Sequence, residues 1–297
     1  MKRKWWLACL MLLALAMPAG AQDEDELLLE EEEEVDPWRG WSIGLNFGGY
    51  FASKKTGSFY NGLCGVGDLD DPNDIQCYTI AERLSADYFL RDWQDITNYY
   101  QIQSFSVPYD SYPMLMRYNP GVAVGINIVY RFDRYNAIVF NSNFSALKAA
   151  DQFTLIFYGG SLPQNQQNDV RLFQIIGEED RVNMNLGYRM GVESGPLANW
   201  YLQLGPAALF TTMRSNEIRV ADRNYQLFLG ATNPNQPVQY RPRTDVGLGG
   251  YASVGIEFFL KDKYTFDISV GMQNDNVILI SYKERVWNKW LQLTFTI

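Results

Sequence analysis

Histidine is absent from the 297-residue sequence. Because histidine is the usual general base of hydrolases and proteases, mechanisms of the Ser–His–Asp kind are excluded. An enzyme based on carboxylates or on a Ser–Lys pair stays open, but no such motif occurs in a suitable context. We therefore expect a protein that is not an enzyme and that needs no cofactor.

Long apolar runs are also missing beyond the amino terminus. The first residues combine the positive Lys2, Arg3 and Lys4 with an apolar stretch at residues 5–17. A small-x-small site ending at Ala21 follows, so residues 1–21 have the organisation of a secretory signal peptide. No later segment approaches the roughly 18 apolar residues that a membrane helix needs. The sequence therefore predicts an exported chain that is either soluble or a β-barrel.

Cysteine is scarce. The sequence contains three, and the predicted signal peptide holds one of them. The remaining two, Cys64 and Cys77, are separated by twelve residues. In the oxidising compartment to which a signal peptide leads, two such cysteines most simply pair. We predict a disulfide between them.

Basic residues are outnumbered by acidic ones, and the formal net charge is −9. No basic patch stands out, so the composition does not support nucleic-acid binding. Much of the negative charge lies in residues 23–36 (DEDELLLEEEEEVD), which begin with Asp23 and end with Asp36. Because like charges repel, we expect residues 22–38 to form a solvated periplasmic leader. Docking of this block onto a basic periplasmic partner is the functional alternative.

Alternation of apolar and polar residues dominates the rest of the sequence. At the carboxy terminus, Leu291, Leu293 and Phe295 alternate with polar side chains up to Ile297, which is the period of a strand with one apolar face. The same pattern predicts about eight antiparallel strands, a bulge at Pro206, and loops at residues 215–243 and 273–276. The predicted strands lie at residues 39–51, 121–132, 138–146 (continuing towards 157), 182–192, 200–213, 246–259, 264–272 and 287–297.

The links between the predicted strands alternate in length. Three are short, at residues 133–136, 193–199 and 261–263, whereas the others are longer and polar. Outer-membrane barrels have short periplasmic turns and long extracellular loops. Aromatic side chains gather at the short links, as in the interfacial girdle of such barrels. The girdle candidates are Trp38, Trp41, Tyr130, Phe132, Trp200, Phe258, Tyr264 and Phe295.

These features resemble the eight-stranded OmpA/OmpX type of barrel, and in particular the outer membrane β-barrel proteins of Bacteroidota. The resemblance covers residues 39–297. It implies an all-β fold, a transmembrane antiparallel up-and-down barrel, surrounded by lipid in the Gram-negative outer membrane. The last strand is similar to the carboxy-terminal assembly signal of such barrels, although Ile297 stands where an aromatic residue is usual. The resemblance rests on a pattern without an invariant motif, so it implies a fold rather than an activity.

Four charged residues fall on the polar face of the predicted strands, which faces the barrel lumen. Eight strands enclose a space just wide enough to be filled by side chains, and charges buried there must pair. We predict a structural plug of salt bridges, resembling the lumen networks of OmpA-type barrels. A gated or selective narrow pore is the alternative. The four residues are Arg131, Arg189, Glu257 and Asp267.

Residues 52–120 are too long for a simple loop. We expect them to form an extracellular insertion that packs as a surface subdomain over the barrel mouth. Four aspartates in this insertion are weak candidates for calcium ligands, but their spacing does not match an EF-hand loop. A solvated acidic loop is therefore expected, with no metal site. The aspartates are Asp68, Asp70, Asp71 and Asp74.

The sequence thus predicts a non-enzymatic integral outer-membrane β-barrel with a structural or interaction role at the cell surface. Two alternatives stay open: a narrow, porin-like passive channel, and an accessory subunit of an outer-membrane secretion or assembly complex.

Overall fold

The structure, a computed structural model, describes residues 38–63, 76–159, 168–195, 197–229, 244–260, 264–280 and 282–297. Most of these residues are in β-strands. Eight long strands carry the architecture: β1 (Gly40–Phe51), β4 (Gly121–Arg131), β5 (Asn136–Tyr158), β6 (Asn168–Glu193), β7 (Ala198–Val220), β10 (Thr244–Phe259), β11 (Thr265–Leu279) and β12 (Tyr282–Thr296).

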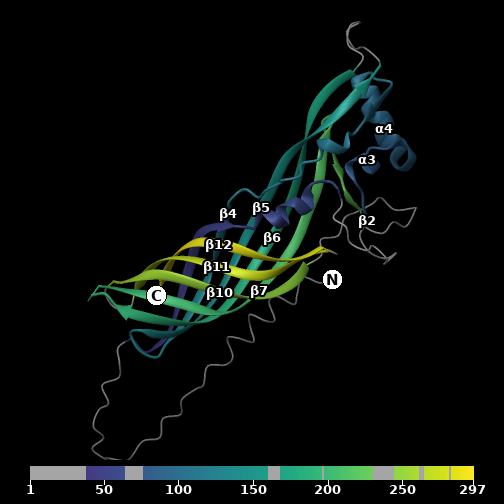
Figure 1. Ribbon diagram of the computed structural model, residues 1–297. Coiled ribbons are helices and arrows are strands. Elements are labelled where there is room, and N and C mark those ends of the chain that lie inside the picture. Colours follow the sequence, from purple (N-terminus) through teal and green to yellow (C-terminus); the bar gives the residue numbers. More distant parts are fainter. Residues whose placement is uncertain are drawn as a thin grey trace, which may run out of the picture. The chain divides into compact units, whose positions relative to one another are not determined.

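The eight strands form one closed antiparallel ring (Figure 1). The order runs from β10 through β11, β12, β1, β4, β5 and β6 to β7, and β7 pairs again with β10. β12 pairs with β1 through positions such as Leu293 opposite Phe47, so the first and last strands of the ring meet as the sequence predicts. The all-β barrel fold with eight strands is confirmed for the described residues.

Side chains alternate between an exposed apolar face and a buried polar face along the barrel strands. On β1, the outward Trp41, Ile43 and Leu45 are 75%, 62% and 68% exposed, whereas the inward Asn46 is 4% exposed. Successive side chains of a strand point to opposite faces, so the alternation of the sequence becomes an apolar outside and a polar inside. This is the reverse of a soluble barrel, which buries its apolar face.

The strand ends that the short links connect lie together at one end of the ring. The links run from Arg131 of β4 to Asn136 of β5, from Glu193 of β6 to Ala198 of β7, and from Phe259 of β10 to Thr265 of β11. At the first link, Asp133 Oδ1 accepts hydrogen bonds from the backbone amides of Tyr135 at 2.7 Å and Asn136 at 2.8 Å, which makes an Asx turn. Partial burial acts to raise the pKa of Asp133, but the hydrogen bonds from the Asn136 side chain and these amides outweigh it and lower the pKa.

The connection between β11 and β12 differs from the prediction. The sequence predicts a loop at residues 273–276, but β11 continues to Leu279, and the chain turns back after Ile280, whose φ is 58°. Gln273 and Asp275 are fully buried inside the ring. The prediction was wrong because polar side chains that face a lumen look like loop residues when only the sequence is known.

Strands β5, β6 and β7 are longer than a membrane crossing requires. They contain 23, 26 and 23 residues, whereas a tilted membrane strand needs about 9–11. The extension of β5 is predicted by its sequence, but the extensions of β6 and β7 are not. β7 reaches Val220 and turns at Ala221 and Asp222, which both have positive φ, into β8 (Arg223–Gln226). The first part of the loop predicted from residue 215 is therefore strand.

The bulge expected at Pro206 does not form. Pro206 lies opposite Gly250 in an unbroken register, and the register with β6 is the same on both sides of it. A register shift occurs instead between Glu178 and Glu179 on β6. The missing amide proton of proline removes one possible ladder hydrogen bond without displacing the strand.

Residues 52–120 contain short helices and strands. Thr79 and Glu82 form a reciprocal capping box at the start of α3 (Ile80–Arg83), and Ser85 caps α4 (Ala86–Tyr100) by accepting a hydrogen bond from the Asp87 amide. None of the described helices is long and apolar enough to cross a membrane. The elements are α2 (Lys54–Gly57), η1 (Ser58–Tyr60), β2 (Gln76–Cys77), α3 (Ile80–Arg83), α4 (Ala86–Tyr100), β3 (Ser104–Ser106) and η2 (Tyr109–Ser111).

An apolar core joins this insertion to the extended strands. Ile80, Leu84 and Ile96 from the insertion cluster with Phe153 of β5 and Ile175 of β6, and each is at most 1% exposed. β3 adds to the edge of β5, and β2 pairs with β9 (Phe228–Leu229). The insertion is therefore a packed subdomain attached to the ring at the end opposite the short links.

Candidate functional site in the barrel lumen

The lower charge cluster, Arg131, Arg189, Glu257 and Asp267, lies in the lumen near the short links. Each of the four residues is 2–5% exposed. Glu257 bridges the two arginines, because Arg131 Nη1 donates to its Oε2 at 3.2 Å and Arg189 Nη1 donates to its Oε1 at 3.1 Å. Arg189 Nη2 also donates to Asp267 Oδ2 at 3.3 Å. The structure thus brings all four sequence-predicted residues together, and their formal charges cancel.

Two neutral side chains complete the lower charge cluster. The hydroxyl of Tyr201 donates to Asp267 Oδ1 at 3.1 Å, and its ring centroid lies 3.9 Å from the guanidinium carbon of Arg189. Gln203 Oε1 accepts from Arg189 Nε at 3.3 Å. Buried ions are tolerated only when their pairing and hydrogen bonding are nearly complete, and this cluster meets that requirement.

A layer of neutral amides lies above the lower charge cluster. Asn46 Nδ2 contacts the side-chain oxygens of Asn141 at 3.1 Å and Asn143 at 2.9 Å. Asn143 Nδ2 donates to Gln292 Oε1 at 3.1 Å, and the hydroxyl of Thr294 donates to Asn46 Oδ1 at 2.9 Å. These residues come from β1, β5 and β12, so the amide layer links strands across the lumen.

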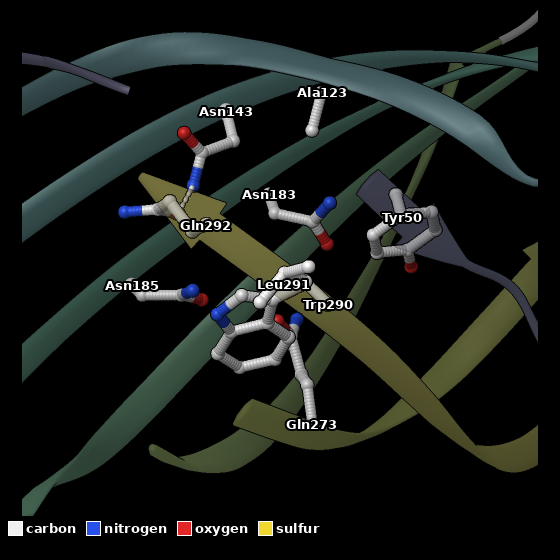
Figure 2. A pocket seen from close by; sticks show the side chains of 9 residues that line it. All are labelled: Tyr50, Ala123, Asn143, Asn183, Asn185, Gln273, Trp290, Leu291 and Gln292. Carbon is white, nitrogen blue, oxygen red and sulfur yellow. Dashed lines mark hydrogen bonds between the residues drawn. The ribbon is translucent and has the colours of Figure 1, made fainter. Parts of the chain in front are cut away.

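Two cavities that lie in the lumen have volumes of about 10 Å³ each. Figure 2 shows the side chains around the first cavity, with the hydrogen bond between Asn143 and Gln292 dashed. Asn185, Trp290 and Gln292 line both cavities and so stand between them. A space of this size holds about one water molecule, which is far less than a continuous hydrated path through the barrel needs.

Trp290 is the largest side chain between the two cavities. Its indole occupies the space beside Gly271 of β11, where a Cβ atom would lie 2.3 Å from the ring. Glycine at position 271 is therefore required for this placement. The sequence prediction assigns Gln292, Thr294 and Thr296 to the lumen face but misses Trp290, which lies on the same face two residues earlier.

The upper charge cluster lies at the other end of the lumen and centres on Glu179 and Arg181 of β6, both fully buried. Arg181 Nε donates to Glu179 Oε1 at 2.5 Å. Arg181 Nη1 lies 3.3 Å from the hydroxyl of Tyr50 and 3.2 Å from Asn288 Oδ1. Strands β1, β6 and β12 thus meet at one buried ion pair.

The insertion contributes directly to the upper charge cluster. The hydroxyls of Tyr60 and Tyr118 donate to Glu179 Oε2 at 2.7 and 2.9 Å, and Arg181 Nη2 donates to Thr56 Oγ1 at 3.1 Å. Burial, together with the negative charge of Glu179, raises the pKa of both tyrosines well above the usual value. Both hydroxyls therefore stay protonated and act as donors, and they hold the insertion against the barrel.

The sequence prediction misses the upper charge cluster although its signal is present. Glu179 and Arg181 are separated from the lumen-facing Arg189 by even numbers of residues along β6. Continuing the alternation from Arg189 towards the start of the strand would therefore have placed both side chains in the lumen. The predicted strand begins at residue 182 instead, because the outward positions before it become acidic. An apolar outer face marks only the part of a strand that contacts lipid.

Several predicted features lie outside the described residues, namely the signal peptide, the acidic leader and Cys64. Cys77 lies on β2, and the disulfide stays a prediction. No group of side chains within the described ranges could hold a metal ion. The four calcium candidates also fall outside these ranges: Asp68, Asp70, Asp71 and Asp74.

The predicted girdle aromatics lie at the short-link end of their strands, and several touch one another. Trp41 lies 4.9 Å from Tyr130, measured between ring centroids, and Tyr264 lies 6.2 Å from Phe295. Trp200, at the start of β7, is 54% exposed. The remaining contacts pair Trp38 with Phe259, Tyr130 with Phe132 and Phe258 with Phe266.

Beyond these aromatics, a belt of exposed apolar side chains surrounds the ring. Representative members on five strands are 45–50% exposed: Val124, Leu204, Val254, Val270 and Leu291. A closed barrel satisfies its own backbone hydrogen bonds, and an apolar outside with a polar inside suits it to lipid. The described barrel is that of an integral protein of the bacterial outer membrane.

No family model matches the chain, and no curated protein matches its sequence. Among solved structures, the chain is similar to Neisserial surface protein A (8% identity, 87% of this chain and 96% of the other, TM-score 0.37). It is also similar to the outer membrane protein OprG from Pseudomonas aeruginosa (8% identity, 88% and 98%, TM-score 0.37) and to Ail, the attachment invasion locus protein of Yersinia pestis (10% identity, 87% and 99%, TM-score 0.30). The likeness is too distant to bear on activity.

Proposed function

We propose that this protein is a closed, non-conducting and non-enzymatic barrel that presents its extracellular subdomain as a structural or interaction surface of the cell. Within outer-membrane barrels, we place it with the OmpA/OmpX-like eight-stranded proteins, of the kind found in Bacteroidota. The ring of eight strands and the alternation of faces support this placement.

The obstruction of the lumen at three levels carries the proposal. The lower charge cluster blocks one end, Trp290 stands between the two cavities, and the pair Glu179–Arg181 blocks the other end. Removing one partner of a buried ion pair costs roughly 3–5 kcal/mol, so an arrangement that leaves either cluster unpaired is strongly disfavoured.

Conductance of the purified protein in planar bilayers tests the closed lumen. We expect the wild type to be silent, and we expect Arg131→Ala with Arg189→Ala to lower thermal stability, because Glu257 and Asp267 lose their partners. The matched control removes two outward arginines of β7, with Arg214→Ala and Arg219→Ala, and is expected to leave stability nearly unchanged. Steady conductance of the wild type, or equal stability of the two double variants, contradicts the proposal.

A narrow passive channel is the second candidate, and the polar lining of the two cavities favours it. If this candidate is right, the wild type conducts. Loss of Arg131 and Arg189 then shifts its selectivity towards cations, because Glu257 and Asp267 remain in the lumen.

We propose that the partner-binding surface lies on the insertion, where several aromatic and apolar side chains are exposed. Tyr88, Tyr109 and Leu115 are 64%, 78% and 74% exposed. A disulfide between Cys64 and Cys77 would brace this region. If the partner that binds this surface is a secretion or assembly complex, the protein is an accessory subunit of that complex.

Docking of the acidic block at residues 23–36 onto a periplasmic protein is a separate part of the proposal. Gentle detergent extraction and identification of co-purifying proteins test both surfaces. We compare the wild type with a deletion of residues 23–34 and with the variant Tyr109→Glu, Leu115→Glu. A partner set that is unchanged in the deletion contradicts docking by the leader, and one unchanged in the double variant contradicts binding by the insertion.

A further inference from the structure

The outward face of β12 carries a row of cations next to the apolar belt. Lys283, Arg285 and Lys289 are exposed, and Trp287, between the last two, is 58% exposed. Their odd numbers match those of Leu291 and Leu293, so all lie on the lipid-facing side of the strand. We call Lys283, Arg285, Trp287 and Lys289 the β12 row.

The register of β12 places this row at the edge of the belt that is farther from the short links, which is the side we propose to be extracellular. Lys289 lies opposite Phe51 of β1 and Met272 of β11, which are each 46% exposed. Arg285 lies four residues farther along, opposite Asn276, or about 10 Å higher for a tilted strand that rises about 3.3 Å per residue. This height is where lipid headgroups meet the acyl chains.

Within the described ranges, no carboxylate forms an ion pair with the β12 row, although the buried Asp275 interacts electrostatically with Arg285. Neither Lys283 nor Lys289 has an ion-pair partner there, and Arg285 Nε donates to the neutral Asn274 Oδ1 at 2.5 Å. Glu284 points to the opposite face of the strand and pairs with a lysine of α2 at 3.2 Å. The row therefore presents a local excess of positive charge to its surroundings.

The outward cations on the other side of the ring behave differently. Lys148 of β5 pairs with Glu178 at 3.2 Å, and Arg214 of β7 pairs with Asp180 at 2.6 Å. They lie beyond the apolar belt on the same extracellular side, but each is neutralised by the neighbouring strand. The β12 row thus differs from Lys148 and Arg214 in that its three cations have no ion-pair partner among the described residues.

We propose that the β12 row binds the phosphate of a phosphorylated glycolipid headgroup, of the lipid A kind, in the outer leaflet of the membrane. An arginine and two lysines supply the charge-assisted hydrogen bonds that phosphate oxygens accept. Trp287, at the same level, suits the boundary between headgroups and acyl chains. The site lies outside the lumen, so it holds whether or not the barrel conducts.

Binding of lipids to the purified full-length protein in detergent, followed by native mass spectrometry, tests the site. The probes are lipid A, lipid A without its phosphate, and phosphatidylglycerol. Each basic residue near an anionic lipid contributes about fivefold to affinity at low salt. We therefore expect Arg285→Gln with Lys289→Gln to weaken binding of lipid A roughly 30-fold, and Lys283→Gln alone to weaken it about fivefold.

The matched control is Lys148→Gln with Arg214→Gln, which removes two outward cations that are already paired and should change affinity less than about twofold. All the substituted side chains are exposed, and retention of the folded barrel is checked by the shift in gel migration on heating. Equal losses in the two double variants overturn the proposal. So does equal affinity for lipid A with and without phosphate, or for phosphatidylglycerol, because the row would then not select a phosphorylated glycolipid.

Discussion

Removing Arg181 alone should destabilise the barrel strongly, whereas removing Arg181 and its partner Glu179 together should not. Arg181→Met keeps the length of the side chain but leaves the fully buried Glu179 with only the donors Tyr60 and Tyr118. Breaking a buried ion pair by removing one partner costs roughly 3–5 kcal/mol.

The magnitude follows from what surrounds Glu179. Its carboxylate keeps the hydroxyls of Tyr60 and Tyr118 at 2.7 and 2.9 Å but loses the guanidinium at 2.5 Å. Because the side chain is fully buried, no solvent replaces the lost partner, and the loss of stability in Arg181→Met should lie in the range given for an unpaired buried charge.

Equilibrium unfolding in urea, followed by tryptophan fluorescence in detergent micelles, measures these differences. Adding Glu179→Gln to Arg181→Met should return the free energy of unfolding to within about 1 kcal/mol of the wild type, because position 179 then carries no unpaired charge. The exposed pair Arg214–Asp180 provides the control, and Arg214→Met should cost less than about 1 kcal/mol. A loss below about 1 kcal/mol in Arg181→Met, or a double variant as unstable as the single one, refutes the reasoning.

Three further predictions concern the seam, a turn and the insertion. Gly48→Ala should destabilise the closed ring by roughly 1–3 kcal/mol, because the new Cβ would lie 2.0 Å from a backbone oxygen of β12. Gly49→Ala on the same strand is the control, since its Cβ would meet nothing closer than 3.4 Å, and it should be nearly neutral in refolding assays. Because the pKa of Asp133 is lowered in the folded protein, its ionised carboxylate stabilises the fold above the pKa of the unfolded state, and this stabilisation is lost as pH falls through the folded-state pKa. Identical acid-unfolding curves for Asp133→Ala and the wild type contradict this. Blocking free thiols before and after reduction should add mass at Cys64 and Cys77 only after reduction; labelling without reduction rules out the disulfide.

The alternation of the sequence is sufficient to predict the barrel because every membrane strand obeys one rule. Leu291, Leu293 and Phe295 face lipid, and the residues between them face the lumen, so strand identity, orientation and the four residues of the lower charge cluster all follow from parity. The short links and their aromatics add the direction of each strand. These signals are local, and the structure places them where the sequence predicts.

The parts that the sequence does not predict depend on contacts between distant segments. The extension of β6 is stabilised by the insertion, whose Tyr60 and Tyr118 reach Glu179 from residues far away in the chain. Likewise, the strand character of Gln273 and Asp275 depends on a lumen that exists only after closure. Beyond the membrane, the outer face of a strand need not be apolar. Apolar and polar residues therefore stop alternating where the subdomain begins, and the strand can no longer be recognised from its sequence.

The placement of charge along the lumen follows the cost of burying it. Ion pairs occupy the two ends, while neutral amides and Trp290 lie between them, where a charge far from water is most costly. One further carboxyl group, that of Asp275, is fully buried beside the upper charge cluster and shares Asn288 with Arg181. Such an interior stabilises the ring, and the two lumen cavities described above, of about 10 Å³ each, are too small for a solute. Selectivity for a partner must then arise on the outer surfaces. The exposed aromatics of the insertion and the unpaired cations of the β12 row are the described features with the chemistry to provide it.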